Sequence, residues 1–508
     1  MNFEKISNKL VEFFLIPLLI ISICGSISLL PTLLQLVPNK AILCFIGLLI
    51  LAYVVYSLLR VKEKFFRILN KIKKPLLIIF ICITLIWQFM LVRALSGEFG
   101  WDPHTLICYV IGKSIAVHDK FYFSFYPNNF LLLVIEKIFK TVFFIKTPSK
   151  LIFALNILNI VIIDLSAYLL FVATKNLFNR KAAWCTLLFY WVLYIVWPFV
   201  VIPYSDNWSI LIGTLFLLIY SKNQNFNNFF LTLCFGIVTA FALLMKPSTV
   251  IFIIAMVITK SFFSLQRKRK IKVRKLFKII VSFGLGFVIL YSPVKTYQQY
   301  NNIVNIESDK KMPITHFIAM GMSGNGSYNA NDVTKNINIK NPQKRNKYNI
   351  KLIRERLSQM GLGGYVKFLV QKQINNTADG AFGWANEGKY LYDPFVKNLN
   401  KIEKHIRILF MHKNANQNYL IADTNISGYK FFPQIVWVVA LLFMLLASIG
   451  DSFETIQLLK YTIVGGFVFL LLFEGGRSRY LIQFLPYLFT LAGVGLNKLI
   501  ILKSKVKK

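Results

Sequence analysis

Charged residues, and acidic ones above all, are scarce in this sequence. Of 508 residues only 16% are charged, with 21 acidic and 59 basic side chains, whereas 56% are hydrophobic. A soluble protein of this length would carry more charge, and apolar runs here repeatedly reach the ~20 residues needed to cross a bilayer core of about 30 Å. The sequence therefore predicts an all-α polytopic membrane protein, because helices are the spanning elements that suit such long runs.

Cysteine is equally rare, with six in the chain and none after Cys234. The long polar segment 295–430 therefore contains no disulfide, and no CxxC pair suggests a bound metal. We expect neither a metal nor a cofactor. A net charge of +38 would indicate a nucleic-acid partner in a soluble protein, but the basic residues here flank apolar runs. The lipid bilayer with its anionic head groups is the expected partner, and nucleic acid is not.

Twelve apolar runs predict about twelve transmembrane helices. The stretches 60–74, 175–181, 267–278 and 503–508 are rich in Lys and Arg, which places them and both termini in the cytoplasm. The acidic loop 451–454 falls on the same side without supporting it. The apolar runs are 11–34, 41–59, 75–95, 150–174, 183–200, 208–220, 229–245, 248–264, 276–294, 431–449, 458–473 and 480–502.

Residues 128–146 look like a further span but carry Glu136, Lys137 and Lys140 at their middle, where charge is costly in hydrocarbon. A crossing here would also move the basic 267–278 stretch to the outer side. We therefore expect an amphipathic helix on the outer surface. The resulting organisation is a transmembrane module over 1–294 with a first outer loop at 96–127, an extracytoplasmic domain over 295–430, and C-terminal transmembrane helices over 431–508.

The extracytoplasmic domain should contain helices of its own. The pattern predicts them at Tyr348–Met360 and Tyr365–Asn375, separated by a break at Gly361–Gly364. The Gly- and Asn-rich segment 320–332 should be a loop.

A few ionisable residues lie in outward turns, and their types suit group transfer from a lipid phosphate. Such a reaction needs a carboxylate to take the proton of an acceptor hydroxyl and cations to hold the departing phosphate. Asp102, in GEFGWDPH, is the candidate base, although an Asp-Pro pair also commonly starts a turn. Glu98 is its neighbour and its rival for the same role.

The other outward ionisable residues suit substrate binding, and each also has a structural explanation. Asp206, in IPYSDNW, could line the same cavity or cap the helix that follows it. Lys246, in LLMKPST, lies at the outer membrane end, where a lysine suits a phosphate or extends toward water. Arg477 and Arg479 can each bind phosphate through two N–H groups, or form an ion-pair lock with Glu474 between the last two spans.

Five segments together resemble the GT-C class of integral-membrane glycosyltransferases, which includes the protein O-mannosyltransferases and the bacterial lipid A aminoarabinose transferase. The resemblance is closer to Gram-positive members that carry a YPNN signature in the first outer loop. The segments are spread over most of the chain: Trp101-Asp102, YFSFYPNN (122–129), MGMSGNGSYNAND (320–332), ADGAFGW (378–384) and FEGGRSRYLIQFLP (473–486).

The resemblance implies a GT-C-like fold, a polyprenyl-phosphate sugar as the donor, undecaprenyl phosphate as its lipid, and inversion at the anomeric carbon. It implies that Asp102 is the catalytic base, although the Asp-Glu pair of the mannosyltransferases is absent because Pro103 follows. Glu98 therefore stays an alternative base. The substrate-binding residues that it implies are Asp206, Lys246, Glu474, Arg477, Arg479 and, from the YPNN signature, Tyr126 and Asn128.

These expectations give one main hypothesis and two alternatives. The main one is transfer of a sugar to an envelope acceptor, such as a wall polysaccharide, a teichoic acid or a protein, on the outer face of a bacterial plasma membrane. The alternatives are a transporter or flippase of lipid-linked sugars and a non-catalytic envelope-polymer assembly protein. A transporter is expected to place ionisable residues at mid-membrane, where Asp164 is the main candidate.

Overall fold

Most of the residues that the structure describes are helical. The computed structural model describes residues 3–37, 63–113, 120–266, 273–384, 394–413, 419–420 and 428–505. The only strands in these ranges are His412–Lys413 (β1) and Tyr419–Leu420 (β2), which form one short antiparallel pair. The all-α prediction is therefore confirmed.

Eight helices in these ranges are long and apolar enough to cross a membrane. Each coincides with one of the twelve predicted runs, and in α3 the apolar part covers Lys74–Leu95. The eight are α1 (Phe3–Gln35), α3 (Glu63–Leu95), α7 (Pro148–Leu177), α11 (Ile251–Gln266), α12 (Val273–Tyr300), α17 (Phe431–Ser448), α18 (Glu454–Leu472) and α19 (Leu485–Lys505).

The other four predicted spans have different outcomes. The run 41–59 lies outside the described residues. The run 183–200 forms α8 (Arg180–Tyr190), which passes into a π-helical turn at Trp191–Ile195 and a 3-10 turn at Pro198–Val201. The remaining two form α9 (Ser205–Lys222) and the shorter apolar helix α10 (Phe229–Met245). The count of about twelve spans thus stays a prediction.

Side-chain caps explain where several of these helices begin. The hydroxyl of Thr147 accepts a hydrogen bond from the backbone of the first turn of α7, and Asn179 and Asn228 do the same for α8 and α10. Asn341 caps α15 (Pro342–Thr377), and Asn400 forms a capping box with α16 (Lys401–Phe410). These side chains bind N–H groups that have no partner within their own helix.

Two glycines allow α10 and α12 to pack with their backbones in contact. A Cβ atom on Gly236 would lie 2.1 Å from the carbonyl oxygen of Phe283, and one on Gly286 would lie 1.9 Å from that of Leu233. No side chain fits at such distances. Small residues at a helix crossing are typical of membrane proteins, in which close backbone packing supplies much of the attraction between helices.

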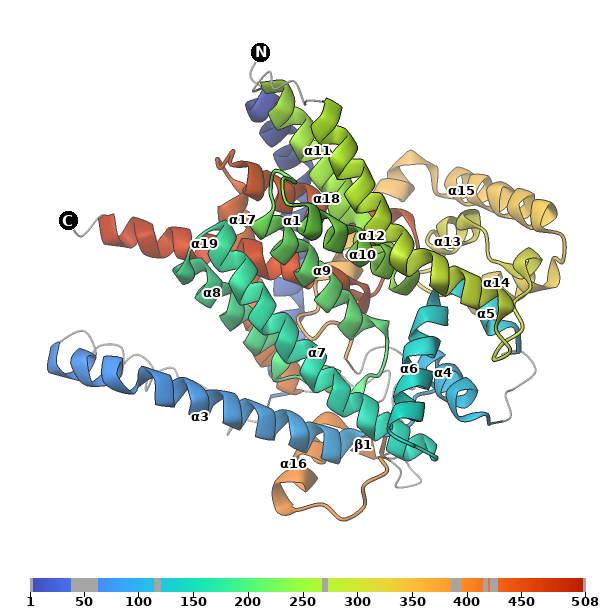
Figure 1. The fold of residues 1–508 in the computed structure, drawn as a ribbon, viewed down its shortest axis with the longest axis horizontal. Helices are drawn as coiled ribbons and strands as arrows, with labels where there is room; N and C mark the ends of the chain where they lie inside the picture. Colours follow the sequence, from blue (N-terminus) through green and yellow to red (C-terminus); the bar gives the residue numbers. More distant parts are fainter. Residues whose placement is uncertain are drawn as a thin grey trace.

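One end of the helical bundle brings together α1, α11 and α18, near the first residues of the chain. The backbone N–H of Phe3 donates to Gln266 at the end of α11, over 2.7 Å. Glu454, the first residue of α18 and the last of the acidic stretch 451–454, pairs with Lys260 of α11. Figure 1 shows the N-terminus at the top and the C-terminus at the left, away from α4, α6 and α13–α16.

The opposite end carries the short helices α4 (Asp102–Ile111), α5 (Tyr122–Phe125) and α6 (Phe130–Val142). Within the predicted surface helix at 128–146 the structure has α6, which packs against α4 and α10, and its position at the outer membrane surface stays a prediction. Glu136 is buried within these contacts rather than exposed on the polar face, and burial raises its pKa.

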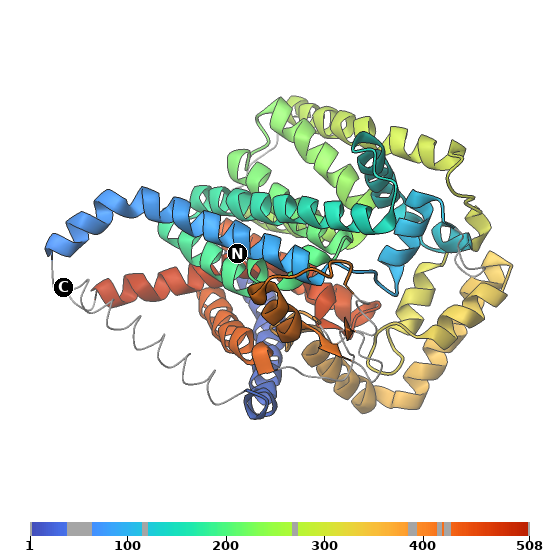
Figure 2. The ribbon, with the colours of Figure 1, turned by 90° about the horizontal axis from the view of Figure 1, so that it is seen from below.

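Four more helices lie at this end: α13 (Ile314–Met320), α14 (Ala330–Asn338), α15 and α16. The two predicted helices at 348–360 and 365–375 are the two halves of α15, and the predicted break is a kink at Gly361. Its φ of 60° is in the left-handed region, which glycine adopts without strain. Figure 2 shows α15 at the edge of the molecule with its halves at an angle.

Candidate functional site

Asp102, the predicted base, is the first residue of α4, and its carboxylate lies among phenol rings. The Tyr204 hydroxyl donates to Oδ2 of Asp102 over 2.7 Å. Asn129 Nδ2 donates to the hydroxyls of Tyr204, at 3.2 Å, and Tyr122. Burial raises the pKa of Asp102, and the hydroxyls of Tyr204 and Tyr122 and the charge of Arg479 oppose this rise. A carboxyl whose pKa is shifted toward neutrality is suited to general-base chemistry.

Asp206, in the first turn of α9, holds two cations. Lys246 Nζ contacts its Oδ1 and Arg479 Nε donates to its Oδ2 over 2.9 Å. All three groups are largely buried: the relative side-chain exposures are 5% for Asp206, 15% for Lys246 and 8% for Arg479. Lys246 reaches this position because α10 ends there, before Pro247. This end of the bundle therefore carries two largely buried cations that share one carboxylate.

Aromatic rings join the two carboxylates. The guanidinium carbon of Arg479 lies 3.9 Å from the ring centroid of Trp101, which is close enough for a cation–π interaction. The Trp101 ring in turn makes an edge-to-face contact with Tyr204 at 5.1 Å. Asp102, Asp206 and Arg479 are thus parts of one continuous group of contacts.

The loop Glu474–Arg477, between α18 and the 3-10 turn Ser478–Phe484, borders this group of contacts on another side. Oε1 of Glu474 accepts from the Tyr480 hydroxyl over 2.6 Å, and burial raises the pKa of Glu474. Arg477 is half-buried, and its charge lowers the pKa of Glu474 and of Tyr328. Gly476, with φ of 68°, leaves no room for a Cβ atom, which would lie 2.2 Å from the carbonyl oxygen of Asn325.

Two motifs from the large polar segment also reach this loop. Gly475 donates its backbone N–H to the carbonyl oxygen of Gly326 over 2.8 Å. Gly326 lies in the loop 321–329, which is shorter than the predicted loop 320–332 because α13 includes Met320 and α14 begins at Ala330. From 378–384, Oδ2 of Asp379 accepts from the Ser478 hydroxyl over 3.1 Å. All five segments quoted for the family resemblance therefore lie in one region of the fold.

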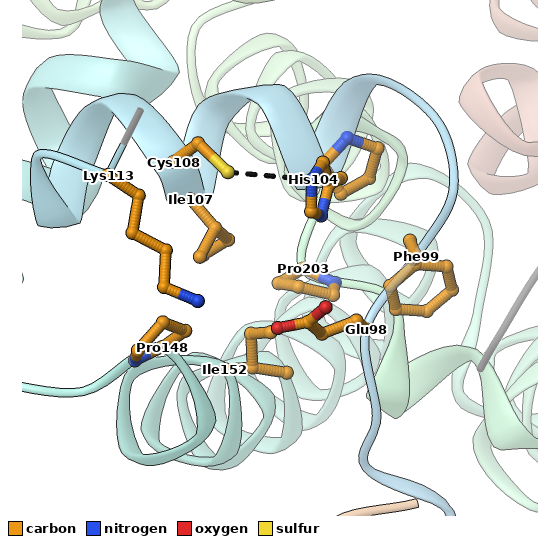
Figure 3. A pocket seen from close by; sticks show the side chains of 10 residues that line it. Glu98, Phe99, His104, Ile107, Cys108, Lys113, Pro148, Ile152 and Pro203 are labelled. Carbon is orange, nitrogen blue, oxygen red and sulfur yellow. Dashed lines mark hydrogen bonds between the residues drawn. The ribbon is translucent and has the colours of Figure 1, made fainter. Parts of the chain in front are cut away.

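Two predicted site residues lie apart from this group. Glu98 lines a separate small pocket whose other polar side chains are His104, Cys108 and Lys113. Figure 3 shows Glu98 and Lys113 both pointing into that pocket. Asn128 is exposed and reaches the group through its neighbour, since its Nδ2 donates to Oδ1 of Asn129 over 3.4 Å. Asn129 is the YPNN residue that donates to the tyrosines.

Tyr126, the remaining predicted residue, does belong to the group. Its ring lies 5.6 Å from that of Tyr122, and its pKa is raised by burial and by the nearby Tyr328, Glu474 and Asp102. The sequence reasoning missed Trp101, Tyr122, Asn129, Tyr204 and Tyr328. Four of them are within the segments quoted for the resemblance, and Tyr204 is two residues before Asp206. Membership of those segments was the available signal, because the contacts of these residues with the predicted acids come from packing between distant parts of the chain.

The described ranges contain no group of three or more His, Cys, Asp or Glu side chains arranged to hold a metal ion. The absence of a metal from the chemistry stays a prediction.

Comparisons with known proteins supply the family but no activity. No curated protein and no solved structure matches the chain. One family model does match, over residues 5–499, and its description is "Conserved hypothetical integral membrane protein". With eight helices of spanning length and a match over nearly its whole length, the chain belongs to this family of integral membrane proteins.

Proposed function

We propose that this protein is a membrane glycosyltransferase of GT-C type that moves a sugar from a polyprenyl-phosphate donor to an envelope acceptor. The observation that carries the proposal is the placement of a half-buried carboxylate, Asp102, in one group of contacts with the cations Lys246 and Arg479. Such a transfer requires removal of a proton and binding of a phosphate. A carboxylate suits the first requirement and cations suit the second, and both are present here.

Asp102 acts as the base in this proposal. The acceptor hydroxyl attacks the anomeric carbon and gives its proton to Asp102, while the bond from that carbon to the phosphate oxygen breaks. The electron pair of the broken bond leaves with the polyprenyl phosphate, and the sugar configuration inverts. Tyr204 and Tyr122 keep the carboxylate in place and, by donating to it, limit the rise of its pKa.

The cations serve the leaving phosphate. Arg479 is enclosed by Asp206 and Trp101, so it supplies a fixed positive charge beside Asp102. Lys246 and Arg477 are more exposed, and we assign to them the direct contacts with the phosphate oxygens. Arg479, preorganised in this way, stabilises the charge that grows as the bond breaks, whereas Lys246 and Arg477 already hold the phosphate in the bound donor complex. Asp206 positions two of these three cations, Lys246 and Arg479. Glu474 positions the loop that carries Arg477, through its bond from Tyr480.

The proposal includes a membrane orientation. The site lies at the end of the bundle opposite the contact between Phe3 and Gln266. We place the basic stretches and both termini in the cytoplasm of a bacterium, with about twelve spans in its plasma membrane and the site on the outer face. A polyprenyl-phosphate sugar would then reach the site from the outer leaflet.

The test is a transfer assay with the full-length protein in proteoliposomes. A panel of radiolabelled polyprenyl-phosphate sugars is offered together with purified wall polysaccharide or teichoic acid. We expect one donor to lose its label to an acceptor, with release of free polyprenyl phosphate. The Asp102→Asn protein, inserted at the same level, is the control and should give no transfer.

Movement of an intact lipid-linked sugar across the bilayer, without cleavage of the sugar-phosphate bond, would contradict the proposal and favour a flippase. The same vesicles report this outcome, because an added enzyme that cleaves only externally exposed donor distinguishes flipped from retained lipid.

A further inference from the structure

The second half of α15 packs against α1 and α17 well inside their ends, and against the last turn of α18. Gln373 and Thr377 donate to the Ser22 hydroxyl over 3.1 and 2.7 Å, and Ser22 lies midway along the apolar run of α1. The indole N–H of Trp437 donates to the carbonyl oxygen of Thr377 over 2.7 Å. Trp437 lies about 9 Å along α17 from its first residue, at ~1.5 Å per residue. The end of α15 therefore lies at the depth of the hydrocarbon core.

The same half of α15 exposes a row of apolar side chains. Leu362, Val366 and Val370 are 85%, 53% and 38% exposed, and their spacing of four puts them on one helix face. The α1 helix against which this half packs also exposes apolar side chains, among them Ile20 and Ile27, each at 47%. Exposed apolar side chains thus occur both on α15 and on the membrane-spanning helix against which it packs.

After α15 the chain turns without helical structure, and this turn is buried. Ala378, Ala381, Phe382 and Trp384 are each at most 3% exposed. In a lipid environment such a turn is tolerated only when protein groups bind its backbone, because no water is present to do so.

Protein side chains bind the backbone of this turn. Gln434 of α17 accepts from the N–H of Gly380 over 2.8 Å and donates to the carbonyl oxygen of Ala378 over 2.7 Å. The carboxylate of Asp379 accepts the N–H groups of Ala381 and Gly383, each over 2.8 Å. These contacts meet the requirement for irregular backbone at membrane depth.

From these observations we infer that residues 362–384 form a re-entrant membrane segment whose exposed face contacts lipid acyl chains. The segment enters the bilayer from the site end, turns while buried against α17, and does not cross. It is the part of the 295–430 segment that lies in the membrane rather than outside it. Asp379 binds Ser478 and Lys372 binds the carbonyls of Leu471 and Phe473, so the re-entrant segment also fixes the loop next to the site.

Lipid photolabelling of the wild-type protein tests this inference without any assumption about activity. The full chain is reconstituted in liposomes that contain a phosphatidylcholine with a diazirine in its acyl chain. After irradiation and trypsin digestion, peptide 357–367, which holds Leu362 and Val366, should carry several-fold more lipid than peptide 312–335 from the same end of the protein. Equal labelling of the two peptides would overturn the inference.

Cysteine labelling in nanodiscs gives a second, independent reading. Val366→Cys should add no label from a water-soluble maleimide beyond that of the wild type, whereas Lys351→Cys, in the first half of α15, should add one. Unfolding in hot SDS should make position 366 reactive, which shows that the cysteine is intact. If Val366→Cys reacts in the bilayer as fast as Lys351→Cys, this face contacts water, and lipid contact is rejected. A protein or second copy that covers the face would instead leave peptide 357–367 without lipid label, which also rejects it.

Discussion

Buried ion pairs occur at both ends of this bundle, but they are built in different ways. At the end near the first residues, Lys460 is fully buried and donates to Asn8, to Glu12 and to the carbonyl oxygen of Asp451, over 2.9, 2.9 and 3.1 Å. Its donors are thereby matched by acceptors from α1 and the loop before α18. Such a cluster joins helices, and its buried cation is fully occupied by protein acceptors.

At the other end the ionic groups are mixed with aromatic rings. Asp206 binds two cations, yet Asp102 accepts from the Tyr204 hydroxyl and lies next to Tyr122 rather than in an ion pair with a Lys or Arg. A carboxylate held by neutral donors keeps a raised pKa, whereas one held by two cations does not. The comparison separates a structural cluster from one suited to chemistry, and mutations can test the distinction.

The largest expected effect is that of Asp102→Asn. If Asp102 is the base, its loss should reduce the transfer rate by about 10²–10⁴-fold, which is the usual range for general-base catalysis, with little change in thermal stability. Glu98→Gln is the matched control, since Glu98 lies in a separate pocket, and it should keep most of the activity. Transfer rates in the proteoliposome assay test this prediction. If Glu98→Gln loses activity while Asp102→Asn retains it, Glu98 rather than Asp102 is the base.

Lys460→Met should produce the opposite pattern. Removal of this buried cation leaves Glu12 and a backbone carbonyl without their partner, and breaking a buried pair typically costs about 3–5 kcal/mol of stability. We expect a clearly lower melting temperature in detergent, with normal activity per folded molecule. A loss of activity at unchanged stability would show that the structural cluster also takes part in the function.

Lys246→Met should mainly weaken donor binding. One charged hydrogen bond to a phosphate is worth about 1.5–3 kcal/mol, so the KM for the donor should rise about tenfold or more. Lys260→Met is the control from the other end, where the lysine pairs with Glu454 instead. A fall in kcat at constant KM for Lys246→Met would place the lysine in the transition state rather than in the bound donor complex.

Hydrophobic runs predicted the long helices because their signal is local and repeated, but they did not predict the break after α8. The run 183–200 has the composition of one span, yet it changes to a π-helical turn at Trp191–Ile195. Indole groups account for this: Trp197 donates to the carbonyl oxygen of Val192 over 2.8 Å and Trp87 to that of Val196 over 2.9 Å. Bonds from side chains to the backbone, whether from five residues away or from another helix, are invisible to hydropathy.

The site shows the same division between local and distant information. Its ionisable members were predicted because they lie in turns at the same end of the predicted spans. The hydrogen-bond partner of Asp102 could not be predicted in this way. Tyr204 is 102 positions away, and it contacts Asp102 only because α4 packs beside the turn before α9. The choice of Asn129 over Asn128 depends on which side chain a 3-10 turn directs inward, which spacing alone does not determine.

The smallest and most specific effect should come from Tyr204→Phe, which removes one hydroxyl and keeps the ring. The hydroxyl donates to the ionised form of Asp102 and so lowers its pKa; without it the pKa rises further. A base works only when ionised, so the acid side of the pH–rate profile should move to higher pH, and activity near neutrality should fall a few-fold, as expected for ~1 kcal/mol of hydrogen bonding.

Tyr461→Phe removes a similar hydroxyl that donates to the carbonyl oxygen of Ser7 over 3.0 Å at the other end, and it should leave the profile in place. A shift of the profile in both variants would mean that the titration reflects overall stability, and no shift in Tyr204→Phe would mean that Asp102 does not titrate in the reaction.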